Sequence, residues 1–159
     1  MKAVTQTPTK QVQKNIFMND IHELDFTLIK KKLADTEEGL GWNSLLCDEA
    51  EEEYKKFLAL KRTYPNMDIV PNKIVDSFWH QHILDTEKYA KDCQEIFGYF
   101  VHHYPYFGMN GAEDAQNLVD AFAETVKLHE MHFNEEFKSQ ATRCKAPKCR
   151  TQCKPMKCK

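Results

Sequence analysis

The stretch KIVDSFWHQHILDTEKYAKDCQEIFG, residues 73–98, determines the kind of fold that we expect for this chain. Apolar side chains recur in it every three or four residues, which is the period of a helix with one buried face. Asp85 interrupts the pattern and can cap a second helix, and Gly98 can end that helix in a left-handed conformation. The stretch therefore predicts two helices, about 73–84 and 85–97. Their inward-facing residues are Val75, Phe78, Trp79, Ile83, Tyr89, Cys93, Ile96 and Phe97.

Two further helices precede this pair. The nearer of the two is expected to start after Asn43 and to end at Pro65, because proline cannot continue a helix. Its inward positions are Leu46, Ala50, Tyr54, Phe57, Leu58 and Tyr64. A first helix is expected to end before Gly39, with a stripe formed by Phe17, Ile21, Leu24, Leu28 and Leu33.

A fifth helix follows an aromatic loop at residues 100–111 and spans about 112–137. Its aligned positions are Ala115, Val119, Phe122, Val126, His129 and Phe133. No stretch alternates convincingly as a strand does. We predict an all-α fold with a single compact domain of about five helices and antiparallel neighbours.

Charge divides the chain into parts. From Lys138 onward there are eight Lys and Arg residues and no acid, whereas the preceding part is acidic. We predict a flexible arm at 1–14, a helical domain at 15–137 and a basic, cysteine-rich tail at 138–159, disordered or loosely docked on the domain. No apolar run approaches the length of a membrane helix and the N-terminus lacks the pattern of a signal peptide, so we expect a cytoplasmic protein with no membrane partner.

The tail contains four cysteines, Cys144, Cys149, Cys153 and Cys158, in the pattern C-x4-C-x3-C-x4-C. Four thiolates can bind zinc or copper, although these gaps are wider than those of a usual zinc knuckle. A second interpretation is that a partner enzyme modifies the same four cysteines. The basic residues could also contact phosphates, but the tail has no aromatic residue to stack on bases, so we do not expect nucleic acid as a partner.

A second group of candidate metal ligands lies among the helices: His80, His82, Cys93, His102, His103 and His129. Imidazole and thiolate are donors that zinc prefers. Helical phase places His82 and His129 on core stripes, whereas His80 turns away and can pair with Asp76 one turn earlier. The alternative is that the buried members are ordinary hydrogen-bonded core residues. In a weaker alternative, Cys93 and a histidine act as nucleophile and base.

The segment from Ile69 to Gly111 also resembles a known family. Its shared pattern comprises Asp76, Trp79, His80, His82, Ile83, Leu84, Tyr89, Asp92, Cys93, Phe97, Gly98, His102, His103 and Pro105. The preceding stretch EEEYKKFLALKRTYP, residues 51–65, is similar as well. The pattern resembles that of the glycine-rich domain-containing protein-like family, without that family's glycine-rich region. The resemblance implies an all-helical domain and no particular biochemical activity.

These observations favour a small helical binding module that coordinates a transition metal ion through Cys and His, with zinc or copper as the cofactor, rather than an enzyme. One alternative is a carrier whose cysteine tail is modified by a partner enzyme. Another is a hydrolase or oxidoreductase that uses the His/Cys cluster.

Overall fold

The structure is a computed structural model that describes residue 16 and residues 18–137. Over these residues it is all-helical and contains no strand, which confirms the predicted fold class. Six helices follow one another: α1 (Asn19–His22), α2 (Thr27–Ala34), α3 (Ser44–Thr63), α4 (Lys73–Leu84), α5 (Thr86–Phe97) and α6 (Ala112–Phe133). The predicted arm at 1–14 and the predicted tail at 138–159 lie outside the described residues.

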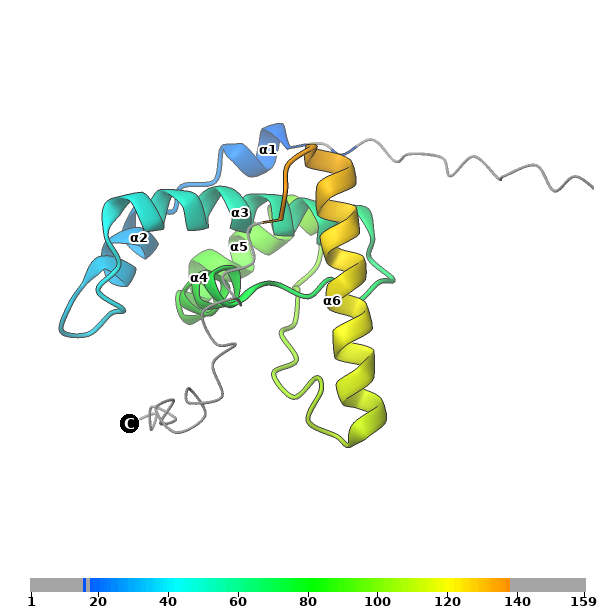
Figure 1. Cartoon of the computed structure of the whole chain (residues 1–159). Helices are drawn as coiled ribbons and strands as arrows, with labels where there is room; N and C mark the ends of the chain where they lie inside the picture. The colour runs from blue at the N-terminus through cyan, green and yellow to red at the C-terminus, as the bar shows by residue number, and fades with distance from the viewer. Residues whose placement is uncertain (1–15, 17, 138–159) are drawn as a thin grey trace, which may run out of the picture.

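Helix α3 is the central element of the domain (Figure 1). It contacts α1, α2, α4 and α6, and α4 in turn packs against α2 and α5. Helix α6 runs across one end of α3, and its first turns extend well beyond the other helices (Figure 1). The α4–α5 pair therefore lies beside the loop that leads into α6.

The starts of three helices follow from side-chain caps. Asn43 accepts a hydrogen bond from the backbone N–H of Leu46, and Asn72 accepts one from that of Val75. Asp85 accepts one from the N–H of Lys88 and so starts α5. Each cap satisfies a backbone donor that has no partner within its own helix. Gly98 ends α5 with a φ of 75°, a conformation that glycine adopts without a steric penalty.

The predicted first helix is wrong in its middle, where the chain breaks between α1 and α2. The carboxylate of Asp25 accepts a hydrogen bond from the N–H of Thr27, and this local turn competes with helix formation. The break turns Phe26 into the core and leaves Leu28 73% exposed, although Leu28 was expected to face inward. Phe17, the predicted start of the stripe, lies outside the described residues.

The last helix also differs from its predicted span and stripe. It ends at Phe133, because Asn134 adopts a left-handed conformation with a φ of 52°. Ala115 and Val119 are exposed, and the buried residues of α6 are confined to Thr125, Leu128 and His129. The sequence period is helical, but the first turns extend past the other helices and, among the described residues, are covered only by the preceding loop, where Leu118 lies against Gly108.

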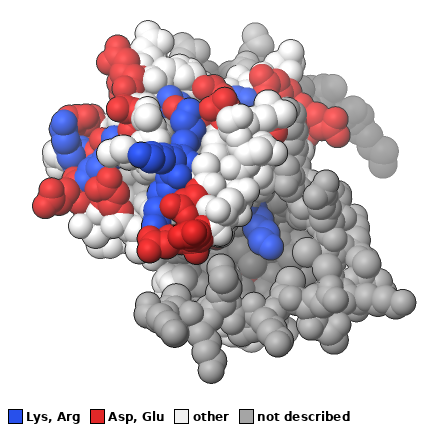
Figure 2. Space-filling model, turned by 90° about the vertical axis from the view of Figure 1, so that its left-hand side faces the viewer, with Lys and Arg blue, Asp and Glu red and all other residues white. Residues whose placement is uncertain are grey.

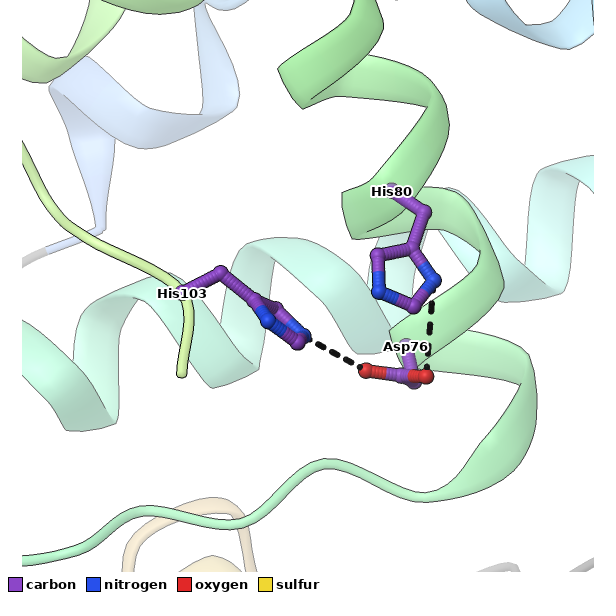
Figure 3. A group of neighbouring side chains, drawn as sticks. All are labelled: Asp76, His80 and His103. Atoms are coloured by element: carbon purple, nitrogen blue, oxygen red, sulfur yellow. Dashed lines mark hydrogen bonds and ion pairs between the residues drawn. The ribbon is translucent and has the colours of Figure 1, made fainter. Parts of the chain in front are cut away.

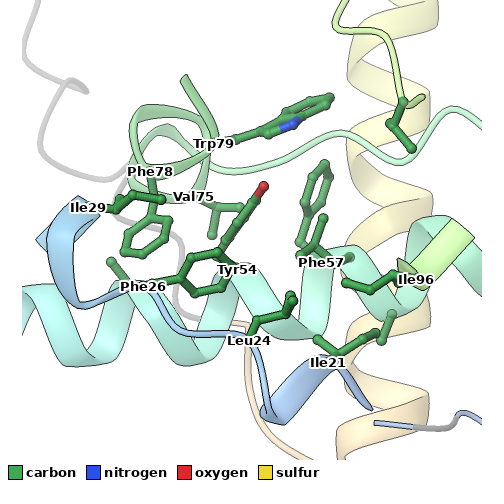
Figure 4. Close-up of a cluster of buried hydrophobic side chains, with 14 of the residues drawn as sticks. Ile21, Leu24, Phe26, Ile29, Tyr54, Phe57, Val75, Phe78, Trp79 and Ile96 are labelled. Atoms are coloured by element: carbon green, nitrogen blue, oxygen red, sulfur yellow. The ribbon is translucent and has the colours of Figure 1, made fainter. Parts of the chain in front are cut away.

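The core consists of aromatic and aliphatic side chains that all six helices contribute (Figure 4). Tyr54 and Phe78 are fully buried, and the ring of Phe26 contacts both at 5.5 and 5.4 Å between centroids. Tilted and edge-to-face pairs of this kind add to the stabilisation that burial alone provides. The tight packing fixes the orientation of α4, which carries the candidate site.

Charges of both signs are interspersed on the face drawn in Figure 2. Lys30 forms ion pairs with Asp48 and Glu51, and Lys32 forms one with Glu38. The described part of this face therefore does not present the continuous basic surface that phosphate-backbone binding requires. In the described part of the chain, no helix has both the length and the apolar character needed to cross a bilayer.

Candidate metal-binding site

Helix α4 carries two polar residues one turn apart on its outer side, Asp76 and His80. The loop after α5 brings His103 to the same carboxylate (Figure 3). His103 Nε2 lies 3.2 Å from Asp76 Oδ1, and His80 Nδ1 lies 3.5 Å from Asp76 Oδ2. One donor atom from each residue can be chosen so that all three lie within 4.8 Å of one another. We call Asp76, His80 and His103 the two-histidine cluster.

The spacing of these atoms is close to that of metal ligands. With zinc–ligand distances of roughly 2.0–2.2 Å, neighbouring ligand atoms around a tetrahedral ion are about 3.4 Å apart. The two contacts of the Asp76 carboxylate, at 3.2 and 3.5 Å, bracket that value. The two contacts are made by different oxygens of Asp76, and the three donor atoms lie within 4.8 Å of one another. Binding a shared ion would therefore require rotations of the imidazoles as well as of the carboxylate.

The loop position of His103 is fixed by a chain of buried hydrogen bonds. Trp79 Nε1 donates to the hydroxyl oxygen of Tyr89 at 3.0 Å. The Tyr89 hydroxyl in turn donates to the carbonyl oxygen of Val101 at 2.6 Å. The His103 ring then packs against Trp79 at 4.5 Å and against His80 at 4.6 Å between centroids. The cluster is thus supported by buried, hydrogen-bonded residues of two helices, Trp79 of α4 and Tyr89 of α5.

The two-histidine cluster lies on the wall of an open cleft of about 630 Å³, which we call the histidine cleft. His102 also lines this cleft, and its ring contacts Phe100 at 5.0 Å. A volume of several hundred Å³ is typical of small-molecule sites. An ion held by the cluster would therefore have room for a water molecule or a ligand on its cleft side.

His82 lies elsewhere, in the core. Its Nδ1 is 2.8 Å from the Tyr54 hydroxyl and its Nε2 is 2.9 Å from Asp92 Oδ2. Burial lowers the pKa of His82, and the hydrogen bond to Asp92 opposes that shift. Both ring nitrogens are engaged, so this arrangement leaves His82 no donor for a metal ion. The role supported here is the alternative one, that of a hydrogen-bonded core histidine.

Cys93 is buried as well and does not line the histidine cleft. Burial raises the pKa of its thiol, which disfavours the thiolate that a nucleophile or a metal ligand requires. The structure therefore does not support grouping Cys93 with His80 and His103 as predicted. It also provides no support for the alternative in which Cys93 acts as a nucleophile.

His129 lies where α6 crosses α3. Its Nε2 is 3.0 Å from Glu53 Oε2, and its Nδ1 is buried without a hydrogen-bond partner among the described residues. It lines a separate, very small cavity and not the histidine cleft. The remaining predicted ligands, Cys144, Cys149, Cys153 and Cys158, lie outside the described residues.

Of the predicted histidines, the structure thus brings together His80 and His103, with His102 on the same cleft. Asp76 was not among the predicted ligands. The signal for it was present, because its i, i+4 relation to His80 can be read from the sequence. A helix turn with a carboxylate and an imidazole at this spacing places two donors on one face.

A model of the UCP032817-like family matches residues 18–138, most of the chain, and the chain belongs to this family. The resemblance to the glycine-rich domain-containing protein-like family is therefore wrong as an assignment. Neither a curated protein nor a solved structure matches the chain.

Proposed function

We propose that this member of the UCP032817-like family binds one divalent transition metal ion, with zinc as the first candidate, through Asp76, His80 and His103. The observation that carries the proposal is the convergence of three donor atoms within 4.8 Å on the wall of the histidine cleft. The donors come from different elements, one helix turn and one loop. Asp76 and His80 lie close together simply because they are one turn apart on a helix, but this spacing does not explain why His103 joins them.

The donor set favours some metals over others. Two imidazoles and one carboxylate suit zinc, and the same set is used by ferrous iron in sites with open positions. Three protein ligands leave at least one position open, which is typical of sites that act on or bind a ligand rather than of closed structural sites. Copper, which favours sulfur or additional imidazole ligands, is a better candidate for the tail cysteines than for this cluster.

The protein supports such a site with little rearrangement. His80 is half exposed, and its partner Asp76 accepts contacts from both imidazoles. A bound cation would replace these two contacts with bonds to the metal, and the negative carboxylate would offset part of its charge. Because α4 is anchored in the core through Phe78 and Trp79, the positions of Asp76 and His80 are set before the ion arrives.

The test is equilibrium dialysis of untagged protein against Zn²⁺, and in a parallel arm against Fe²⁺ under anaerobic conditions, followed by elemental analysis. The four tail cysteines are first changed to serine so that their thiolates do not compete. We expect about one ion per chain, and we expect Asp76→Asn, His80→Gln and His103→Gln each to weaken binding by roughly tenfold or more.

His22→Gln is the matched control, because His22 is an exposed histidine on α1 that does not line the cleft. It should bind metal as the parent protein does. Thermal melts of all variants check that folding is retained. If the three cluster variants bind zinc as tightly as the His22 variant does, the two-histidine cluster is not a metal site.

A further inference from the structure

The histidine cleft holds a positively charged group that the two-histidine cluster does not use. Lys61 of α3 lines the cleft, and its ammonium nitrogen lies 5.4 Å from the Trp79 ring centroid and 5.7 Å from that of Phe57. Both rings are buried, so they hold the lysine in one region of the cleft wall. Trp79 is also the ring against which His103 packs, so the lysine and the cluster share a neighbour.

Lys61 differs from other partly buried lysines of the domain, because no carboxylate pairs with it among the described residues. Lys30, Lys55 and Lys56 each form an ion pair with a carboxylate. Among the described residues, Lys61 forms no such pair and no hydrogen bond, and Asp68 only attracts it from a distance. Burial lowers its pKa, which is the cost of keeping a charge beside two aromatic rings without a close anion. An anion bound in the cleft would offset part of that cost.

The charges that line the cleft also favour an anionic ligand. Lys61 and Lys73 are balanced by Asp68 and Asp76. A divalent cation at the two-histidine cluster would therefore leave the cleft with two surplus positive charges. The rest of the lining is mostly apolar and includes Pro105, Phe107 and Leu118. Such a surface suits the body of a small organic molecule, with few polar groups to set its orientation.

We infer that the histidine cleft binds a small organic carboxylate, with Lys61 pairing with the carboxylate group and the apolar wall holding the rest of the molecule. The inference rests on the proposed function in one respect, since a bound metal ion would add positive charge to the same cleft. Lys61 supplies its own charge whether or not the metal is bound. The two ideas can therefore fail separately.

Benzoate is the probe, and benzamide, which has the same shape without the charge, is the matched control ligand. Binding is followed by tryptophan fluorescence in a Trp42→Phe background, where Trp79 in the cleft wall is the remaining tryptophan of the chain. The background also carries the four tail Cys→Ser changes, with and without Zn²⁺. We expect benzoate to bind the zinc-loaded protein at least tenfold more tightly than benzamide, and more weakly but still preferentially without zinc.

Lys61→Met keeps the unbranched apolar stem, although it is one heavy atom shorter, and removes the charge, whereas Lys61→Arg keeps the charge. We expect the Met variant to lose at least tenfold in benzoate affinity with benzamide unchanged, and the Arg variant to retain most of the preference. Zinc binding by the Met variant should match that of the parent, and a thermal melt checks its folding.

If zinc binds but benzoate binds no better than benzamide, the inference about Lys61 is wrong and the metal site stands. If zinc does not bind but the preference for benzoate still depends on Lys61, the proposed function is wrong and the anion site stands. An equal affinity of the Met variant and the parent for benzoate overturns the inference in either case.

Discussion

The hydroxyl group of Tyr89 donates a 2.6 Å hydrogen bond to the carbonyl oxygen of Val101, and this bond ties helix α5 to the loop that carries His103. Val101 is buried and lies two residues before His103. The same hydroxyl accepts a hydrogen bond from Trp79 Nε1, so one oxygen connects α4, α5 and the loop. The relative position of His80 and His103 thus depends on Tyr89, although Tyr89 forms no hydrogen bond with either histidine.

The first prediction concerns this connection. Tyr89→Phe keeps the ring but leaves the Val101 carbonyl and the Trp79 N–H buried without their partner. We expect the free energy of unfolding to fall by about 2–4 kcal/mol, because two buried polar groups lose their hydrogen bonds. Zinc affinity should also fall, since the loop that carries His103 is less firmly held. Urea unfolding and zinc titration measure the two effects.

Tyr99→Phe is the control for this change, because Tyr99 is 49% exposed and lies next to the same loop. It should change neither quantity by much. A Tyr89→Phe protein as stable as the Tyr99→Phe protein would contradict the role assigned to the Tyr89 hydroxyl.

Local signals in the sequence were enough to locate most of the helices. Asn43, Asn72 and Asp85 are capping residues, and each one starts a helix where it was expected. The break after α1 could not be found in this way, because Leu24 and Leu28 keep a helical period across it. What decides it is the competition of the Asp25 turn with the helix and the burial of Phe26.

The candidate site likewise has one part that the sequence predicts and one part that it does not. The pairing of Asp76 with His80 is local and could be read from an i, i+4 spacing. The arrival of His103 depends on how the loop after Gly98 folds back, and that path is set by the Tyr89–Val101 bond and by packing on Trp79. Contacts between residues this far apart in the chain leave no periodic signal. Helical phase nevertheless separated the buried His82 from the exposed His80 correctly.

The second prediction uses that separation. His82→Ala removes a buried ring and leaves the Tyr54 hydroxyl and the Asp92 carboxylate without their shared partner, so we expect a loss of about 2–5 kcal/mol in the free energy of unfolding. His80→Ala removes a half-exposed ring and should cost less than about 0.5 kcal/mol. Chemical denaturation of both variants in metal-free buffer makes the comparison. Equal losses of unfolding free energy would contradict the view that His82 is a structural core residue and His80 is not.

The third prediction concerns acid. Burial alone would raise the pKa of Glu53, but hydrogen bonds from His129 and Lys56 outweigh it and lower the pKa to about 2. An unperturbed glutamate titrates near 4.5. Because the folded state has the lower pKa, the stabilisation by Glu53 is complete above pH 4.5 and is lost as the pH falls toward 2.

Glu53→Gln removes this contribution. We expect the variant to be less stable than the parent at neutral pH and to lose less stability between about pH 5 and pH 3. Glu49→Gln, on the exposed face of the same helix, is the matched control. Urea unfolding at several pH values gives the slopes, and parallel slopes for the parent and the Glu53 variant would rule out the assigned role.

The fourth prediction concerns the boundary of the folded unit. All residues of the described hydrophobic core lie between Ile21 and Leu128, and Phe137 adds a ring contact to His129 at 5.0 Å. A protein that ends at Lys138 retains all of these contacts. We expect it to keep the helical circular dichroism and the cooperative thermal melt of the full chain. Loss of the cooperative melt would mean that the tail contributes to the core.

The last prediction concerns the tail itself, where Cys144, Cys149, Cys153 and Cys158 are expected to bind a soft metal ion when reduced. Each thiol must lose its proton to become a ligand, and the neighbouring lysines and arginines favour the thiolate. Four thiolates around one divalent ion carry two net negative charges, which the same cations offset. Titration of a peptide of residues 140–159 with Zn²⁺ or Cu⁺ against a competing chelator should therefore show tight binding.

The control is a peptide with all four cysteines changed to serine. If both peptides bind equally weakly, the tail does not coordinate metal, and modification of its cysteines by a partner enzyme becomes the leading alternative. Mass spectrometry of the tail from its native host would then show a mass change confined to residues after Gln140.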